Sequence, residues 1–168
     1  MNTADLAQRL AEVERRLDAL ESTPAAETQA PAGDNAFWLL NGLAAGPDIP
    51  DGSVAFGGDV HLGGRSYQYQ WQRPTHAVTD EPWTDAITRL SALAHPLRAE
   101  ILRRLLTAPA TAADLVEEGI VSSTSTAYHH LNELSSAGWI IKAKASTFEI
   151  RPSRVIALMT IIIAGEDH

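Results

Sequence analysis

Helix start and stop signals divide residues 95–138 into three short helices, and this division limits the possible fold more than any other feature of the sequence. Proline suits the first turn of a helix, so His95-Pro96 marks the start of the first one. Thr111 is an N-cap candidate with an aspartate three residues later, which is the spacing of a capping box. Gly119 and Gly138 are suited to helix C-termini. We therefore expect helices over 96–106, 112–118 and 123–137.

The third helix has two different faces. Its apolar residues Ala127, Leu131 and Leu134 lie at helical spacing and predict the buried face, and His130 is expected to pack at the helix side. Two short helices joined by a tight turn, the second one polar at its N-terminal end, are typical of a helix-turn-helix. The polar face consists of Thr124, Ser125, Tyr128 and His129.

A two-stranded wing is expected directly after the third helix. Residues 139–151 contain two short apolar runs around a predicted turn at Ala145-Ser146, with Lys142 and Lys144 on the outer side. The predicted fold class is mainly α with a small β component. It comprises a winged helix-turn-helix preceded by an N-terminal coiled-coil helix and a small segment with a β-hairpin.

Three sequence motifs in this half of the chain resemble one family. They are Leu-Ala-His-Pro-Leu-Arg at 93–98, Ser-Thr-Ala-Tyr-His-His-Leu at 125–131 and Ala-Gly-Trp-Ile at 137–140. Together they resemble the ArsR-type winged-helix family of bacterial transcriptional regulators, over residues 85–164. The absence of cysteine is a departure from relatives that sense metals through cysteine pairs.

The resemblance implies a regulator, in the first instance a repressor, that binds double-stranded DNA as a homodimer. The dimer would form through the helix near Ala86–Leu93 and a C-terminal helix, Arg154–Ala164. The helix at 123–137 would enter the major groove, where hydroxyl and imidazole groups contact base edges, and the wing would contact phosphates. Arg98 and Arg103 would either contact phosphates as well or pair with Glu100 or Asp114. The predicted DNA-binding residues are Ser123, Thr124, Ser125, Tyr128, His129, Lys142, Lys144 and Arg151.

Net charge leaves a second function open. The formal charge of −8 disfavours a nucleic-acid partner when the chain is taken as a whole. However, residues 1–83 carry 5 basic and 12 acidic side chains, whereas residues 84–155 carry 8 and 7. The third helix has no Lys or Arg. The alternative is therefore a protein-interaction or self-assembly module, built on a winged helix that no longer reads DNA.

The N-terminal segment, residues 1–21, has the apolar pattern of a coiled coil. Charges of opposite sign beside the seam, such as Arg9 and Glu14, favour a parallel pair and higher assembly, although a single helix docked on its own domain is the alternative. Residues 22–35 contain two prolines and small residues, which predict a flexible linker. The seam consists of Leu6, Leu10, Val13, Leu17 and Leu20.

Residues 36–83 predict a small β-rich segment between the linker and the domain at 84–168. Ala36–Leu43 is expected to form a short helix or strand, and the following residues alternate as in a hairpin with a turn at Gly63-Gly64. One face of this hairpin is aromatic and the other is rich in glutamine. The aromatic face either packs on a neighbouring element or binds a ligand or partner.

Several classes of function are excluded or disfavoured by what the sequence lacks. Without cysteine there is no disulfide scaffold, thiolate zinc site or catalytic thiol. Glu166, Asp167 and His168 are metal-ligand types but are not spaced along a helix, so we expect no metal site and no cofactor. No phosphate loop or nucleophile elbow is present, so we expect no enzyme.

We also expect no membrane association. The longest apolar run, Val155–Ala164, has about half of the roughly 20 residues that a membrane span requires. The N-terminal residues are charged from Asp5 onward and do not resemble a signal peptide, which favours the cytoplasm.

Overall fold

The computed structural model describes Arg9, Arg15, residues 38–46 and residues 49–167. The predicted coiled-coil seam from Leu6 to Leu20 and the predicted linker at 22–35 lie outside the described residues. The chain divides into two compact units, with the division after Pro47. In the first unit, the segment predicted as helix or strand is the helix α2 (Trp38–Ala44).

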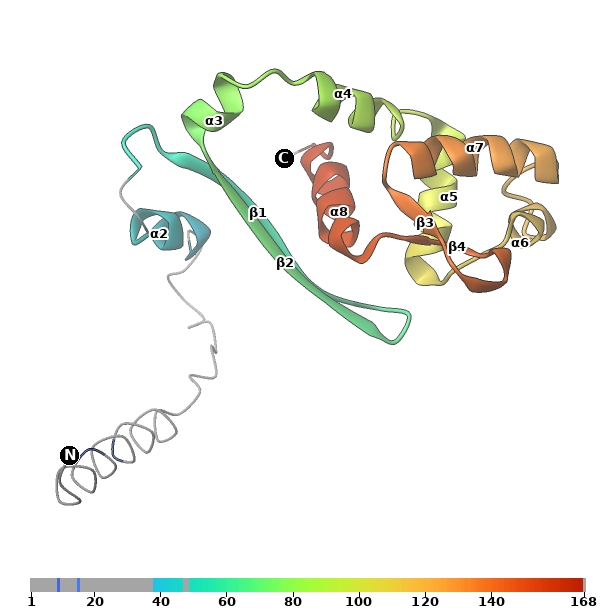
Figure 1. Cartoon of the computed structure of the whole chain (residues 1–168), viewed down its shortest axis with the longest axis horizontal. Coiled ribbons are helices and arrows are strands. Elements are labelled where there is room, and N and C mark those ends of the chain that lie inside the picture. The colour runs from blue at the N-terminus through green and yellow to red at the C-terminus, as the bar shows by residue number, and fades with distance from the viewer. Residues whose placement is uncertain (1–8, 10–14, 16–37, 47–48, 168) are drawn as a thin grey trace. The chain divides into compact units, whose positions relative to one another are not determined.

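The second unit contains the predicted three-helix motif (Figure 1). Its helices are α5 (Pro96–Thr107), α6 (Ala112–Glu117) and α7 (Thr124–Ser136), close to the expected ranges. The buried residues of these helices and of the wing form one core. Its largest fully buried side chains are Trp139, Ile101, Leu115, Leu131, Leu134 and Ile140.

A polar side chain caps the N-terminus of each of the three helices. His95 Nδ1 accepts a hydrogen bond from the Leu97 amide at 3.2 Å. Thr111 and Asp114 form the predicted capping box around α6, with reciprocal hydrogen bonds of 3.1 and 2.8 Å. Such caps satisfy amides that have no partner within the helix, and each contributes roughly 0.5–2 kcal/mol. The starts of the helices are therefore fixed by local chemistry.

The wing has the predicted two-stranded form. Strands β3 (Ile140–Lys142) and β4 (Phe148–Ile150) are antiparallel, and the turn between them contains the 3₁₀ segment η1 (Lys144–Ser146). Ala145 and Ser146 have positive φ angles of 54° and 60°, which confirms the predicted position of the turn. A second 3₁₀ segment, η2 (Pro152–Arg154), leads from the wing into the last helix.

Two further helices flank this domain, as expected. Helix α4 (Thr84–Ser91) precedes it and α8 (Val155–Ala164) follows it. Trp139 immediately precedes β3, and its Nε1 donates to the Arg89 carbonyl at 2.8 Å, which joins α4 to the start of the wing. Helix α8 buries its first turns in the common core, and Figure 1 shows it between the winged domain and the β1–β2 hairpin. No helix within the described residues is long and apolar enough to span a membrane.

The predicted hairpin consists of β1 (Ser53–Leu62) and β2 (Arg65–Pro74), paired in register from Ser53 with Pro74 to Leu62 with Arg65. Gly63 and Gly64 form its two-residue turn with φ angles of 55° and 74°, as a type I′ turn requires. A short helix, α3 (Thr75–Thr79), follows and was not expected from the sequence. Its N-cap position, Pro74, makes no side-chain capping bond, so the usual start signal is missing.

Candidate nucleic-acid interface

Helix α7 presents one exposed polar row at its N-terminal end. Ala127, Leu131 and Leu134 are completely buried, so the residues on the opposite side face solvent. Thr124, Ser125, Tyr128 and His129 are largely accessible from this side, as predicted. The row therefore combines hydroxyl and imidazole groups that are free to approach a ligand.

Ser123, also predicted to bind DNA, has a structural role at the start of the same helix. Its Oγ accepts a hydrogen bond from the Thr126 amide at 3.1 Å and lies 2.9 Å from the Thr126 hydroxyl. One acceptor lone pair of the Ser123 Oγ is thus already occupied. Fewer hydrogen-bonding positions of this hydroxyl are left for a ligand.

Tyr128 connects the exposed row to the wing. Its ring meets the ring of Phe148 edge to face, with 6.3 Å between centroids, and 43% of the residue remains exposed. Phe148 is the register partner of Lys142 in the β3–β4 pair. Through this contact, the position of the wing depends on α7.

A histidine cluster lies under the exposed row. His130 is buried, its Nδ1 has no hydrogen-bond partner among the described residues, and its ring lies 4.9 Å from the His95 ring and 5.1 Å from the His129 ring. Burial lowers the pKa of His130, and His95, His129 and Arg98 lower it further. The packing role predicted for His130 is confirmed by this burial. His129 remains exposed on the outer side.

Six of the eight basic side chains in residues 84–155 fall into two groups. In the first group each cation has a partner: Arg103 pairs with Glu100 at 2.7 Å, and Arg104 forms two hydrogen bonds with Glu118. Arg98 donates to the carbonyl oxygens of Ala92 and Ser91, at the C-terminal end of α4. Of the ion pairs predicted for Arg98 and Arg103, the structure contains the one between Arg103 and Glu100. Neither arginine pairs with Asp114.

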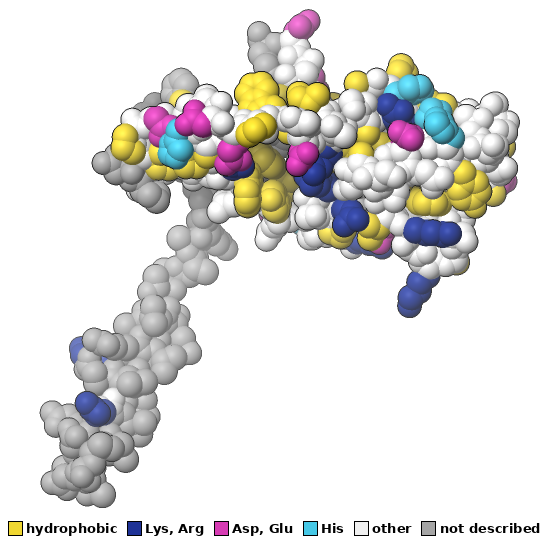
Figure 2. Space-filling model, turned by 45° about the horizontal axis from the view of Figure 1, so that its top comes forward, with side chains coloured by type: hydrophobic (Ala, Val, Ile, Leu, Met, Phe, Trp, Pro, Cys, Tyr) yellow, Lys and Arg dark blue, Asp and Glu magenta, His cyan; other side chains and the backbone are white. Residues whose placement is uncertain are grey.

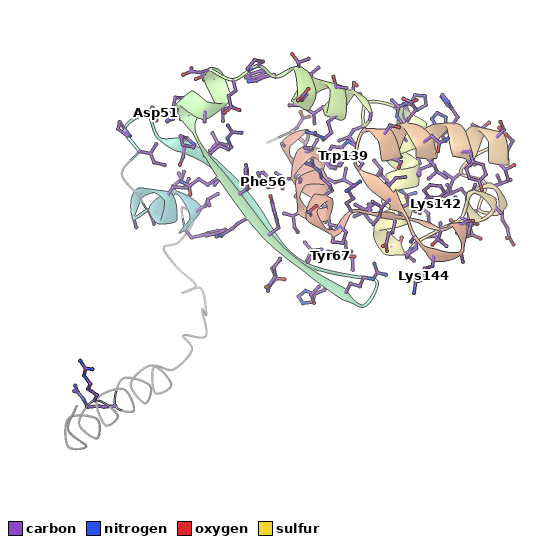
Figure 3. All side chains as sticks on the ribbon, in the orientation of Figure 1. Asp51, Phe56, Tyr67, Trp139, Lys142 and Lys144 are labelled. Atoms are coloured by element: carbon purple, nitrogen blue, oxygen red, sulfur yellow. The ribbon has the colours of Figure 1, made fainter. Side chains whose placement is uncertain are left out.

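The second group has no ion-pair partner within the described residues. Lys142, Lys144 and Arg151 lie on or beside the wing. Lys142 shares a face of the wing with its register partner Phe148, and Figure 3 labels it on the side toward α7 rather than on the predicted outer side, whereas Lys144 lies at the turn. On the face in Figure 2, most Lys and Arg side chains of the second unit lie toward the helix-turn-helix end. Such side chains are available to neutralise phosphates.

Sequence reasoning gave no special role to Arg89 and Arg154. Both lie near the base of the wing, and Arg154 has its guanidinium carbon 5.6 Å from the centroid of the Trp139 ring. Burial lowers the pKa of Arg154, and Arg89 contributes to the decrease. These contacts join residues that are far apart in sequence, so no local sequence pattern predicts them. Within the described part of the chain, no three His, Asp or Glu residues are grouped so as to hold a metal ion.

The helix-turn-helix of the second unit matches a known family of domains. Residues 93–140 match a family model described as a helix-turn-helix domain. Among curated proteins, none matches the chain. A similar solved structure is the homodimeric winged helix-turn-helix DNA-binding domain of a possible ArsR-family transcriptional regulator from Mycobacterium bovis, with 19% identity and a TM-score of 0.39. The similarity covers 58% of this chain and 93% of that one. Residues 93–140 therefore contain a helix-turn-helix, and the strands β3 and β4 that follow α7 add a wing to it.

Proposed function

We propose that the chain is a homodimeric DNA-binding transcriptional regulator that acts as a repressor in the cytoplasm. Helix α7 enters the major groove, and the wing contacts the phosphate backbone on the flanking side. Two copies related by a two-fold axis read the two halves of a pseudo-palindromic site. No enzymatic step, metal or cofactor is part of this proposal.

The observation that carries the proposal is the pairing of an exposed polar row on α7 with unpaired cations on the wing. Tyr128 packs on Phe148, whose strand partner is Lys142, so the row and the first wing lysine adjoin. Hydroxyl and imidazole groups read base edges, whereas lysines bind phosphates without regard to sequence. The geometry thus combines specificity with affinity in one surface.

Dimer formation is supported by apolar side chains that the single chain leaves exposed. Ile87 and Leu90 on α4 are 55% and 38% exposed, and Ile162 and Ile163 on α8 are 58% and 54% exposed. These are the two helices that the family resemblance assigns to the dimer. A second copy would remove these surfaces from water, at a gain of about 25 cal/mol per Å² buried.

The experiment that tests base readout compares cognate with random DNA. His129→Ala removes an exposed imidazole together with its ring contact with His130, and Tyr128→Phe removes a hydroxyl while it keeps the ring contact with Phe148. We expect His129→Ala to weaken binding to the cognate site by about 1–3 kcal/mol, with little change on random DNA. Ser136→Ala, at the C-terminal end of α7, is the matched control. Equal losses on both DNAs would remove His129 from the base-reading surface.

One observation favours the alternative function. Helix α7 contains no Lys or Arg, which is unusual for a surface that must approach phosphates. A protein-interaction or self-assembly module would use the exposed apolar residues of α4 and α8 instead. Failure to bind any DNA near 50 mM salt, together with growth of the particle mass with concentration, would favour this function.

A further inference from the structure

The β1–β2 hairpin gathers its aromatic residues on one face. Cross-strand partners lie on the same face of a sheet, and Phe56 pairs with Trp71, Gly58 with Tyr69 and Val60 with Tyr67. Figure 3 shows Phe56 and Tyr67 on the side of the hairpin that faces α8 and the wing. The predicted aromatic face therefore points toward the body of the second unit.

Helix α8 covers only the middle of this face. A Cβ atom on Gly58 would lie 3.3 Å from two carbons of Ile156, so the strand and the helix are in close contact at this point. Tyr67 packs against the common core. Toward the other end of the hairpin the face extends past the first turn of α8, where Trp71 remains 51% exposed.

A pocket of about 380 Å³ lies between the β1–β2 hairpin and the N-terminal end of α8. This volume lies within the range of small-molecule sites, roughly 300–1,000 Å³. One wall is aromatic, and the Phe56 and Tyr69 rings are 5.9 Å apart with a 36° tilt. The opposite wall comes from η2 and the first turn of α8 and includes Arg154, whose guanidinium carbon also lies 5.6 Å from the centroid of the Trp139 ring. The lining residues are Phe56, Tyr69, Trp71, Ser153, Arg154 and Ala157.

The charge of this pocket is positive and is not neutralised by the protein. Arg154 is partly buried and has no carboxylate partner among the residues that the structure describes, whereas the partly buried Arg104 is held by Glu118. Burial lowers the pKa of Arg154, and the nearby cations Arg89 and Arg151 add to this decrease. A partly buried cation without a counter-ion is unfavourable, and an anion in the pocket would relieve this cost.

We propose that this pocket binds a small anionic aromatic molecule. The acidic group, a carboxylate or sulfonate, pairs with Arg154, and the ring system stacks among Phe56, Tyr69 and Trp71. Aromatic side chains favour offset or edge contacts with a ring, and arginine forms two parallel hydrogen bonds with a planar carboxylate. A neutral apolar molecule would gain the ring contacts but not the hydrogen bonds to Arg154. The site is separate from the α7 row, and binding to it does not require DNA.

The test uses two fluorescent probes that differ in charge. The anionic probe is 1-anilinonaphthalene-8-sulfonate, and the neutral probe is N-phenyl-1-naphthylamine, each titrated into the full-length protein without DNA. We expect one molecule of the anionic probe per chain. Arg154→Gln should weaken its affinity at least about tenfold, because the charge-assisted hydrogen bonds to the sulfonate no longer form, and should change the affinity for the neutral probe much less.

Two further variants separate the pocket from general apolar binding. Trp71→Ala should weaken binding of both probes, whereas Trp83→Ala should affect neither, although Trp83 is similarly exposed elsewhere on the unit. Because Arg154 also contacts Trp139, its replacement affects packing. Ser153→Asp therefore serves as the second charge variant: it adds a negative charge at an exposed pocket residue and should repel only the anionic probe.

Three results would overturn the proposal. The first is an anionic-probe affinity that stays unchanged in both Arg154→Gln and Ser153→Asp. The second is an equal loss of affinity in Trp83→Ala and Trp71→Ala. The third is binding that disappears as protein concentration rises and chains associate, which would assign the pocket to an interface between copies.

Discussion

His130 shows how one residue type serves different purposes at neighbouring positions of α7. The ring of His129 is exposed and available for base contact, while the next ring is buried against His95. His95 in turn caps α5 through its Nδ1. Helical periodicity separates these two roles, and it was visible in the sequence because Leu131 and Leu134 define the buried side.

The lowered pKa of His130 predicts a decrease in stability with falling pH. The folded state holds this imidazole neutral to a lower pH than the unfolded chain does, so the unfolded chain gains its proton first. The free energy of unfolding should therefore decrease as the pH falls from about 7.5 to about 6, through the ordinary histidine pKa of roughly 6.5. Carboxylates titrate lower, near about 4, and do not obscure this window.

His130→Leu replaces the titrating imidazole at this buried position with an apolar side chain. We expect urea denaturation of this variant to show a flatter dependence on pH over the same window. His61→Gln, at an exposed hairpin position, is the matched control and should retain the decrease. An unchanged slope in His130→Leu would show that other groups cause the pH dependence.

The β1–β2 hairpin packs against the winged domain at two places. Its tip lies against the C-terminal end of α5, where a Cβ on Gly63 would overlap the backbone oxygen of Thr107. Arg65, the first residue after the turn, forms a 2.9 Å ion pair with Glu149 of β4. The hairpin is thus attached to the domain at both its tip and its aromatic face.

Alanine substitutions at the two turn glycines should lower stability by different amounts. Both have positive φ, so either alanine variant incurs backbone strain of about 1 kcal/mol. Only Gly63→Ala also pushes the hairpin tip away from α5, because Gly64 has open space where a Cβ would be. We expect Gly63→Ala to lower the urea midpoint more than Gly64→Ala does. Equal effects would mean that the tip is not held against α5 in solution.

Elements set by local chemistry were predictable, and contacts between distant elements were not. The Thr111–Asp114 box and the Gly63-Gly64 turn are each defined within a few residues, so their sequence signals were sufficient. The packing of the hairpin on α8 depends on Gly58 meeting Ile156, far along the chain, and no spacing rule predicts such a pair. The same holds for the ring contact that joins the exposed row of α7 to the wing.

We expect two chains to associate through α4 and α8. If α4 and α8 form the proposed dimer interface, Ile87→Asp places an unpaired charge in it and should shift the protein toward single chains. Ala113→Asp, at an exposed position on α6, should leave the mass unchanged. Sedimentation over a range of concentrations measures both variants.

This measurement is best made on the full chain and on residues 48–168 in parallel. The shorter chain retains the compact second unit and lacks the segment predicted as a coiled coil. A dimer in both, weakened by Ile87→Asp in the shorter chain, supports the proposed interface. A shorter chain that remains monomeric at every concentration would contradict it.

The central claim is that α7 and the wing bind DNA, and the dependence of affinity on salt tests it most directly. Fluorescence anisotropy of the full chain with a fragment of its own promoter, from about 50 to about 200 mM salt, gives the number of phosphate contacts as a slope. The double variant Lys142→Gln, Lys144→Gln removes two phosphate-binding cations per chain, so the slope should become shallower by roughly 1 for each lysine replaced. Arg103→Gln, which removes an exposed arginine already paired with Glu100, should keep the slope of the unmodified protein. Selective, salt-sensitive binding that the double variant weakens is the predicted result. The absence of binding at the lowest salt, or an identical slope in the double variant, would contradict the account.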